Sequence, residues 1–547
     1  MVRLVVVRVV LVLGSTSFSQ SKIAVLKGQG PGWGPGERGR RDVGGELTIG
    51  DVFRNAARAV PRRTAAVLGD EVLTFADIDR GADSLVPVLR RLGVRRGERV
   101  VVWSGTDLEV VPLFAALAKT GAVYAPIGTS LGPDEAAAVA GAARPTLVVV
   151  DAAHAEAGAE LSGRVDAPLA VLRAPGTGTL PRGRQDPPVL ARDGDTAGGA
   201  GGDEGLEGPT EDDPHVVFFT SGSTGRPKGA VLSHRTNALR THPGALLEPR
   251  GPMVCPYPLF HMGAWTIALQ QWQARDAVVL LGAADAPAIT TAVARHGATR
   301  LNAIPAVWGR ILATAGADGR VPALSTLRFA DTGTSATPVE LLEAITRAVP
   351  QAQVRVFYGS TEAGSVASLD HVDIARKPGS CGVPGPGVEV RVAGDGELQV
   401  RGPLLFDGYF GDDDATAAAF TDGWYRTGDL AEVDDEGYLT ITGRLHDVIR
   451  SGGESVSPAE VEGVLAGHPA VADVAVVGLP DPAWGEIVCA VVVVAPGARP
   501  PTLGDLRAHC AGRLAPFKVP RRLEVPELPR TESTHQVMRR LLVERLG

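Results

Sequence analysis

Short runs of valine, isoleucine and leucine recur along this chain between amphipathic stretches, and no other feature limits its possible folds as strongly. Such runs are typical of strands that are buried on both faces of a parallel sheet and joined by helices. The strand-like runs are Arg99–Trp103, Ala122–Ile127, Thr146–Asp151, Ala277–Leu281 and Val354–Tyr358. Helical patterns lie at Ile49–Val60, Leu108–Thr120 and Thr290–His296, and Ala65–Leu73 has the pattern of a hairpin. The sequence therefore predicts a large α/β domain.

The character of the sequence changes after Gly443. Helical patterns at Pro458–Leu465 and Leu503–Arg513 alternate with strand-like runs at Val471–Gly478 and Cys489–Val494. These elements predict a compact α+β unit of about a hundred residues. At the other end, the Gly/Pro/Arg-rich tract Gly28–Gly45 has too few apolar side chains to fill a core. We expect residues 1–46 to be a disordered extension and the polar stretch Arg192–Pro214 to be a solvated loop.

Composition excludes several broad classes of protein. The 547 residues carry a net charge of -8, so no basic surplus points to nucleic acid as a partner. The apolar run Val9–Leu13 is too short to span a bilayer, and no other segment is long and apolar enough to do so, so no stable membrane insertion is expected. The four cysteines form no C-x-x-C pair, which argues against a disulfide framework and a zinc site. We expect a cytoplasmic protein, and none of these features predicts its oligomeric state.

The most informative stretch is Phe218–Gly229, which reads FFTSGSTGRPKG and follows a short apolar run. Its glycines allow a tight turn whose N–H groups converge, while hydroxyl groups and the Lys228 ammonium add further donors. This combination suits a polyphosphate. The loop is not a Walker A motif, because Lys228 precedes a glycine and no serine or threonine follows it directly.

Three further motifs follow in a fixed order: YGSTEAG at Tyr358–Gly364, YRTGDL at Tyr425–Leu430 and GRLHDVIRSGGE at Gly443–Glu454. Together with the phosphate loop, this set resembles the adenylate-forming superfamily of acyl-CoA synthetases, luciferases and peptide-synthetase adenylation domains. The resemblance extends from about Leu47 to the C-terminus. It implies an N-terminal α/β domain with several sheets at 47–445 and a smaller, mobile α+β domain at 446–547.

The resemblance implies a reaction in two steps. A carboxylate attacks the α-phosphate of ATP to give an acyl-adenylate and pyrophosphate, and a thiol then takes the acyl group. Such chemistry needs donors, cations and Mg²⁺ where negative charge develops. The implied substrates and cofactors are therefore a small carboxylic acid, ATP, Mg²⁺ and CoA.

By resemblance, the nucleotide-binding positions lie in all of these motifs. They are Thr220, Ser221, Gly222, Ser223, Thr224, Gly225 and Lys228 for the outer phosphates, Thr361 for the α-phosphate, Tyr358, Gly359, Gly333 and Thr334 for adenine, and Asp429 and Arg444 for the ribose. Glu362 is implied to hold Mg²⁺, for which a carboxylate oxygen is a suitable ligand. The expected catalytic positions are Thr361, Glu362, His261, Lys228 and the position occupied by Gln536.

The acyl group and the thiol arm have their own implied segments. PLFHMG at Pro258–Gly263 resembles the family segment that lines the acyl pocket, with His261 as its polar member, and Trp265, Trp308, Thr334 and Ser335 are expected to shape this pocket. The hinge between the domains falls at His446, where the family usually has aspartate or lysine. Ser451, Gly452 and Gly453 are implied to line the pantetheine tunnel, and PAWGE at Pro482–Glu486 matches the CoA-ligase pattern.

The sequence departs from the family at its C-terminal end. Most members have a P-R-T-x-x-G-K motif whose lysine reaches the reacting carboxylate and α-phosphate. Here the segment reads PRTESTHQVMRR from Pro529, and either His535 or Gln536 occupies the lysine position, depending on where the count begins. The chain has only six lysines and 48 arginines, so a general replacement of lysine by arginine could be considered. Such a replacement would have left a positive charge at this position, and neither histidine nor glutamine carries the charge of the lysine. The protein is then a slow ligase, a ligase in which His535 or an arginine such as Arg530 substitutes, or a homologue that binds nucleotide without efficient adenylation.

The expected function is an acyl-CoA synthetase for a fatty or aryl acid. An enzyme that loads an acyl carrier protein is the first alternative, because the thiol arm is the same, and a non-catalytic nucleotide-binding homologue is the second. An α-amino acid is disfavoured, because the window Phe260–Ile267 offers no acidic side chain for the ammonium group.

Overall fold

A computed structural model of the chain describes residues 46–172, 188–191, 208–221, 227–242, 250–333, 337–451, 454–482, 484–525, 527–530 and 537–547. These residues belong to a compact unit that begins at Glu46. The predicted extension, up to residue 45, and residues 192–207 of the predicted loop lie outside the described residues. In the described part of the chain, no helix is both long and apolar enough to cross a membrane.

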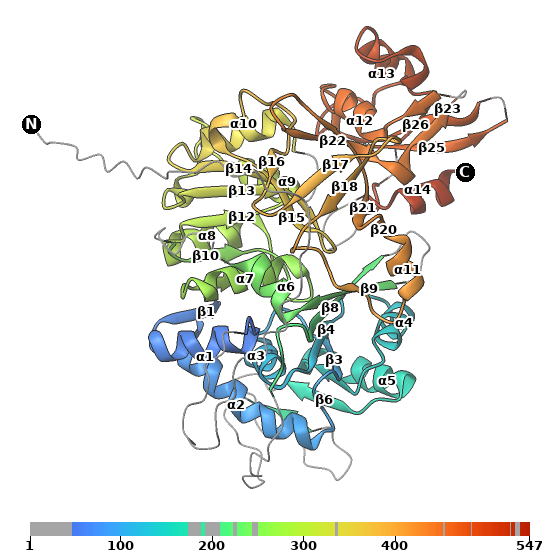
Figure 1. Cartoon of the computed structure of the whole chain (residues 1–547). Helices are drawn as coiled ribbons and strands as arrows, with labels where there is room; N and C mark the ends of the chain where they lie inside the picture. Colours follow the sequence, from blue (N-terminus) through green and yellow to red (C-terminus); the bar gives the residue numbers. More distant parts are fainter. Residues whose placement is uncertain are drawn as a thin grey trace, which may run out of the picture. The chain divides into compact units, whose positions relative to one another are not determined.

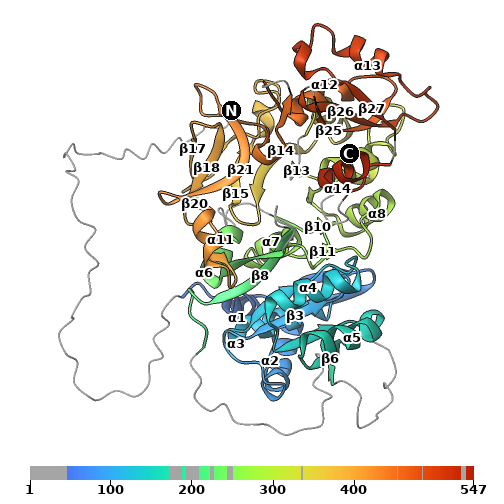
Figure 2. The same ribbon diagram turned by 90° about the vertical axis from the view of Figure 1, so that its right-hand side faces the viewer.

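The first large sheet has eight strands (Figures 1 and 2). Its order is β19 (Gly408–Tyr409), β9 (Pro227–Ser233), β8 (Pro214–Ser221), β4 (Val123–Pro126), β3 (Arg99–Trp103), β5 (Leu147–Val150), β6 (Leu169–Leu172) and β7 (Val189–Leu190). From β8 to β7 the strands are parallel. Alternate residues of β3 enter different apolar clusters, Val100 and Val102 one and Val101 and Trp103 the other, so both faces are buried. Helices α4 (Pro133–Ala143) and α5 (Ala155–Val165) cover the face of Val101 and Trp103.

The second large sheet has nine strands in the order β16 (Val383–Pro384), β15 (Gly364–Leu369), β14 (Gln353–Ser360), β13 (Phe329–Gly333), β12 (Arg300–Asn302), β10 (Met253–Cys255), β11 (Val278–Leu280), β1 (Thr64–Leu68) and β2 (Glu71–Thr74). The strands from β14 to β1 are parallel. Helices α8 (Ala286–His296), α9 (Pro305–Leu312) and α10 (Val339–Ala348) pack along it.

A layer of helices joins the two large sheets. It consists of α1 (Ile49–Ala59), α2 (Phe75–Arg91), α3 (Val110–Thr120), α6 (His234–Thr241) and α7 (Met262–Gln273). Trp265 of α7 stacks on Phe114 of α3 with ring centroids 3.9 Å apart and also meets Tyr124 of the eight-stranded sheet. On the same helix, the indole of Trp272 donates to the Ala65 carbonyl of the nine-stranded sheet, so α7 contacts both sheets.

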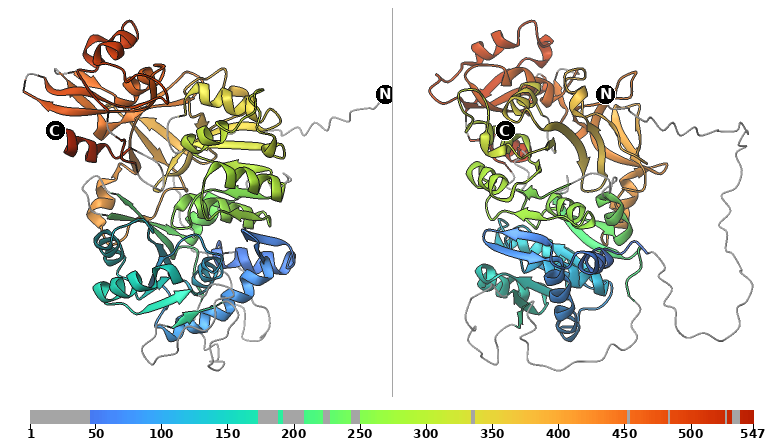
Figure 3. Two further views of the ribbon diagram at one scale, coloured as in Figure 1. Left: turned by 180° about the vertical axis from the view of Figure 1, so that it is seen from behind. Right: turned by 90° about the vertical axis from the view of Figure 1, so that its left-hand side faces the viewer.

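Two five-stranded sheets complete the described fold. The first is formed by β17 (Glu389–Val392), β18 (Glu397–Arg401), β21 (Trp424–Val433), β20 (Phe420–Thr421) and β22 (Leu439–Arg444), with α11 (Asp413–Ala418) preceding β20. The second is formed by β24 (Glu454–Val456), β23 (Ile449–Ser451), β26 (Gly485–Val494), β25 (Val471–Asp481) and β27 (Arg522–Glu524). Helices α12 (Pro458–Ala466) and α13 (Leu503–Cys510) cover one face of this second sheet, and α14 (Arg539–Leu546) covers the other (Figure 3).

Most of the predicted elements are confirmed, including the strand at 99–103 and the hairpin of β1 and β2. The boundaries near the C-terminus differ. The hairpin of β25 and β26 continues to the pair Asp481 and Gly485, because main-chain pairing persists where the side chains become polar. Helix α13 stops at Cys510, since Gly512 follows with a positive φ of 74°. Pro214 belongs to β8 rather than to the predicted loop.

The buried histidines His215 and His234 predict a loss of stability in acid. Their rings lie 4.6 Å apart, and each accepts a hydrogen bond at Nδ1, from Asn237 and from the Ile49 amide respectively. Burial lowers the pKa of His215 and lowers that of His234 to about 4. Between the unfolded pKa of about 6.5 and these values, the unfolded chain binds more protons, so the free energy of unfolding falls as the pH falls.

From pH 7 to pH 5 we expect His234 alone to lower the free energy of unfolding by about 2 kcal/mol, with a further loss from His215. Urea titrations at both pH values measure this difference. The double variant His215→Asn/His234→Asn keeps an acceptor at each position but cannot be protonated. An equal loss in that variant would show that other groups cause the acid sensitivity.

Candidate active site

Several predicted segments meet at one edge of the nine-stranded sheet. Strand β10 leads into the segment 256–261, β13 ends at Gly333, and β14 leads into Thr361 and Glu362. After β10 the chain forms β11 on one side of that strand and then β12 on the other. In parallel α/β sheets, ligands bind beside the carboxyl ends of strands at such a reversal of strand order. The topology therefore brings the segments predicted for the acyl group, adenine and α-phosphate to a typical ligand-binding edge.

Two glycines permit close main-chain contact at this edge. A Cβ atom at Gly333 would lie 2.2 Å from the Phe357 carbonyl oxygen, and one at Gly359 would lie 2.1 Å from the Gly364 carbonyl oxygen. Neither position can carry a side chain without displacing main chain. Thr334 and Ser335, which follow Gly333, lie outside the described residues.

The turn that carries Thr361 and Glu362 is held by the buried side chain of Arg240. Its Nη1 donates to the Thr361 carbonyl, its Nη2 to the Glu362 carbonyl and its Nε to the Leu404 carbonyl, each at 2.7 Å. Burial lowers the pKa of this guanidinium to about 10. Arg240 comes from α6, so a helix that follows the phosphate loop fixes the main chain of a turn that lies 121 residues further along.

The phosphate loop joins two antiparallel strands. Thr220 of β8 pairs with Lys228 of β9, and the last pair before the loop is Ser221 with Pro227. Gly222, Ser223, Thr224 and Gly225 lie outside the described residues. The Lys228 ammonium lies 5.0 Å from the centroid of the Tyr409 ring, and the Tyr409 hydroxyl donates to Glu362 Oε1 at 3.2 Å. The lysine of the loop and the predicted metal ligand thus share a neighbour.

Asp429 forms the centre of a second cluster. Its Oδ2 accepts from the Tyr358 hydroxyl at 2.5 Å, and its Oδ1 lies 2.7 Å from Arg444 Nε. Arg444 stands directly opposite on β22, because Asp429 and Arg444 are paired in the antiparallel ladder. Burial raises the pKa of Asp429 although both partners favour the charged form. Three residues that the resemblance assigns to adenine and ribose are therefore in direct contact.

The turn before Asp429 is held by the buried carboxylate of Glu397. One oxygen accepts from the Gly428 amide at 3.0 Å, and the other accepts from Arg426 Nε at 2.7 Å. The Asp429 amide donates in turn to the Thr427 hydroxyl. Glu397 thus fixes the loop from which Asp429 projects.

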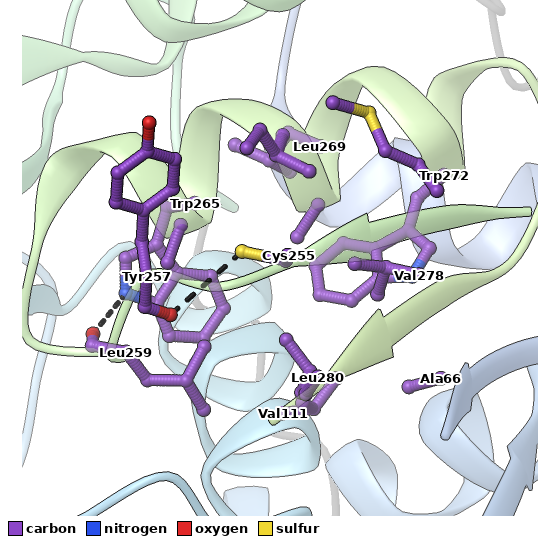
Figure 4. Packing of buried hydrophobic residues seen from close by; sticks show 14 of the residues in the cluster. Ala66, Val111, Cys255, Tyr257, Leu259, Trp265, Leu269, Trp272, Val278 and Leu280 are labelled. Carbon is purple, nitrogen blue, oxygen red and sulfur yellow. Dashed lines mark hydrogen bonds between the residues drawn. The ribbon is translucent and has the colours of Figure 1, made fainter. Parts of the chain in front are cut away.

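His261 caps the N-terminus of α7. Its Nδ1 accepts from the Gly263 amide at 3.4 Å, its ring stacks near Tyr257, and burial lowers its pKa. The two tryptophans predicted to shape the pocket are instead fully buried in the core. Trp265 donates to the Leu259 carbonyl at 2.6 Å (Figure 4). Trp308 donates to the Asp331 carbonyl at 3.0 Å. We therefore correct their assignment from lining to core packing, because α7 and α9 turn these side chains inward.

The segments implied for the thiol step are only partly described. Ser451 ends β23 and is fully buried, and its main chain pairs with Gly485. The side chain of His446 and the residues Gly452, Gly453, His535 and Gln536 lie outside the described residues. Three cations near the C-terminal end have carboxylate partners. Arg530 pairs with Asp473, Arg539 with Glu462 and Lys518 with Glu460, each at 2.6 Å.

Arg240, Glu397 and Tyr409 are site residues that the motifs did not indicate. Each of them acts across a long stretch of chain on a residue that does belong to a motif. Their sequence surroundings gave no signal, because Arg240 lies on a helix rich in polar residues and Glu397 belongs to the alternating pattern ELQVR. Neither pattern names the partner.

Comparisons with known proteins agree with this geometry. A family model described as AMP-binding enzyme matches residues 53–410, and one described as AMP-binding enzyme C-terminal domain matches residues 460–534. A feruloyl-CoA synthase from Amycolatopsis is 35% identical over 512 residues, which cover 90% of this chain and 97% of that protein. The long-chain-fatty-acid–CoA ligase FadD13 of Mycobacterium tuberculosis is 31% identical and covers 91% of this chain and 98% of its own.

Among solved structures, the o-succinylbenzoate CoA synthetase MenE of Bacillus subtilis superimposes with a TM-score of 0.78 and 25% identity. The match covers 90% of this chain and 97% of MenE in its complex with an acyl-adenylate intermediate. A second MenE complex, with ATP and a magnesium ion, gives the same TM-score.

Proposed function

Because the chain belongs to the AMP-binding enzyme family, we propose that it is an AMP-forming acyl-CoA ligase that activates a fatty or aryl carboxylic acid. A carboxylate oxygen of the acid attacks the α-phosphorus of ATP, the bond to the bridging oxygen breaks, and pyrophosphate leaves. The sulfur of CoA then attacks the acyl carbon, the bond to AMP breaks, and the thiol proton passes to solvent. The products are acyl-CoA, AMP and pyrophosphate.

The contact of Asp429 with Tyr358 and Arg444 carries this proposal. A buried carboxylate beside a tyrosine ring and an arginine offers an acceptor for two ribose hydroxyls and an aromatic face for a base. The three side chains come from three strands, and two of these belong to a different sheet from the third. Such convergence supports a nucleoside site better than any single motif does.

The residues present also fit Mg²⁺. Within the described residues, no group of three or more His, Cys, Asp and Glu side chains could form a metal site built from protein ligands alone. Mg²⁺ is commonly held by one or two carboxylates together with substrate phosphates and water, so the single carboxylate of Glu362 is a suitable ligand. When bound, the ion neutralises charge on the phosphate oxygens.

We assign the remaining groups by their chemistry. Lys228 and Thr220 lie where the strands enter the phosphate loop and bind the outer phosphates, and Thr361 donates to the α-phosphate. His261 and its neighbours face the acid. Ser451 and the hinge at His446 serve the thiol step, in which the domain 446–547 moves against 47–445. The four cysteines are free thiols, which supports a reducing compartment such as the cytoplasm.

CoA is the proposed acceptor, and an acyl carrier protein is the alternative. The exposed Trp484 supports CoA, since the Arg521 guanidinium lies 3.8 Å from its ring centroid and Gly485 beside it pairs with Ser451. An exposed indole backed by a cation is suited to stacking a nucleotide base.

The test is pyrophosphate release with Mg-ATP across fatty, aryl and short-chain acids, without acceptor, with CoA or with a phosphopantetheinyl carrier protein. We expect release with at least one acid and formation of its CoA thioester. Thioester formation only on the carrier protein would favour the alternative acceptor. No release with any acid, despite measurable ATP binding, would favour a non-catalytic nucleotide-binding protein.

A further inference from the structure

Tyr409 touches both charged groups that the proposed reaction places around the phosphates. Its hydroxyl donates to Glu362 Oε1 at 3.2 Å, and its ring lies 5.0 Å from the Lys228 ammonium. Glu362 and Lys228 are only partly buried, so each can take a ligand as well as this contact. No catalytic or binding motif of the sequence includes Tyr409.

The main chain explains why this tyrosine reaches both groups. The two-residue strand β19 pairs antiparallel with β9, and Tyr409 lies opposite Ala230. Lys228 is two residues before Ala230 on β9, so it projects from the same face and is the diagonal neighbour of Tyr409. The next residue continues the contact, because the Phe410 amide donates to the Gly229 carbonyl at 2.7 Å.

Aromatic neighbours fix the orientation of the Tyr409 ring. Phe406 meets it edge to face with ring centroids 4.8 Å apart, and Phe406 also packs against Phe420 and Tyr425. The ring is therefore held in place while its hydroxyl donates to Glu362.

The Glu362 main chain is fixed from the same side. Its carbonyl accepts from Arg240 Nη2 and from the Phe406 amide, both at 2.7 Å. With the main chain held in this way, the remaining freedom of Glu362 is the rotation of its side chain. The Tyr409 hydroxyl restrains that rotation.

We infer that Tyr409 is a positioning residue, which orients the Glu362 carboxylate toward Mg²⁺ and holds Lys228 beside the phosphates. The inference rests on the proposed function, because it takes Glu362 as the metal ligand. One oxygen of the carboxylate accepts the hydrogen bond from the Tyr409 hydroxyl, and the other is left for the ion. The phenol does not touch substrate, and its effect passes through its two neighbours.

The test measures metal binding directly. Mn²⁺ replaces Mg²⁺ as the probe, because carboxylate and phosphate oxygens bind both ions. α,β-Methylene-ATP replaces ATP, because its α–β bridge cannot be cleaved. Electron paramagnetic resonance then gives the Mn²⁺ affinity of the complex without turnover. We expect Tyr409→Phe, which keeps the ring but loses the hydroxyl, to weaken Mn²⁺ binding about tenfold, as for a lost hydrogen bond to a charged group.

Two further variants separate the two contacts. In a Glu362→Gln background, Tyr409→Phe should change Mn²⁺ affinity less than twofold, because its partner is already lost. Tyr409→Leu removes the ring as well. Relative to Tyr409→Phe, it should weaken nucleotide binding in EDTA about threefold, since Lys228 loses its aromatic neighbour.

Tyr438→Phe is a matched control on the surface. The Tyr438 hydroxyl donates to Asp373 Oδ2 at 2.9 Å, and its ring lies 4.7 Å from the Lys377 ammonium, so the same change removes the same kind of contact elsewhere. We expect it to leave Mn²⁺ affinity unchanged. The inference would be overturned if both tyrosine variants weakened Mn²⁺ binding equally. It would also be overturned if Tyr409→Phe left Mn²⁺ affinity unchanged while the wild type binds Mn²⁺ and releases pyrophosphate. In either case the proposed function would stand. A wild-type protein that binds neither metal nor nucleotide would overturn the proposed function as well.

Discussion

Replacement of Asp429 by asparagine is expected to lower kcat/KM for ATP by about 10²-fold or more. Asparagine keeps the volume but removes the negative charge that Arg444 faces and one of the strong acceptors for the Tyr358 hydroxyl. A hydrogen bond to a charged group contributes about 1.5–3 kcal/mol, so the weakening of two such contacts and of the proposed ribose contacts accounts for the size of the effect. Steady-state pyrophosphate release with varied ATP, together with calorimetric AMP binding, measures it.

The pH dependence gives a second readout of the same variant. Burial raises the pKa of Asp429, so protonation in the acid range should weaken ATP binding in the wild type. That acid limb should disappear in Asp429→Asn. Asp434→Asn, on a surface loop where the carboxylate pairs with Lys377, is the control and should leave both the rate and the pH profile unchanged. A change of less than threefold in Asp429→Asn would contradict the nucleoside site.

Introduction of lysine at Gln536 is expected to raise the rate of acyl-adenylate formation by about 10²–10³-fold, the usual effect of one group that stabilises transition-state charge. The reason is that three cations of the C-terminal part already have carboxylate partners. Arg530, Arg539 and Lys518 each form an ion pair at 2.6 Å with a carboxylate of the C-terminal part, and the use of any one of them would break that pair. This geometry disfavours the substitution of Arg530 for the missing lysine.

His535→Lys is made in parallel, because the spacing of the motif leaves both positions open. Single-turnover pyrophosphate release measures the first half-reaction, and thioester formation from a synthetic acyl-adenylate measures the second. We expect only the first to respond, since the lysine would act on the carboxylate and α-phosphate. Unchanged adenylation in both variants would mean that the wild-type protein stabilises this charge in another way.

The sequence predicted most of the buried strands, because valine-rich runs such as Arg99–Trp103 are apolar on both faces and need no partner to be recognised. It also predicted the members of the Asp429 cluster, through a resemblance that covers Tyr358, Asp429 and Arg444. It missed Arg240, whose contacts with the Thr361 and Glu362 carbonyls span more than 120 residues and involve no side chain of those two positions. Main-chain recognition of this kind leaves no mark in the partner's sequence.

The same reasoning explains the error at Trp265. The residue lies four positions after His261 and two after the segment Pro258–Gly263 that the resemblance assigns to the acyl pocket, and proximity in sequence suggested proximity in function. In the helix α7, however, Trp265 faces Phe114 and Tyr124 of the core. His261 precedes the helix as its N-cap, whereas Trp265 lies inside the helix and packs in the core, so closeness in sequence did not give the two residues the same surroundings.

The hydrogen bonds from Arg240 to the Thr361 and Glu362 carbonyls have a consequence for protein engineering. Because the Arg240 guanidinium binds main-chain carbonyl groups, the side chains at 361 and 362 take no part in these contacts. A library that varies those two positions should retain a folded scaffold while its metal preference and nucleotide preference change. The turn can thus present different side chains, because the residue that holds it, Arg240, lies on α6, which such a library leaves unchanged.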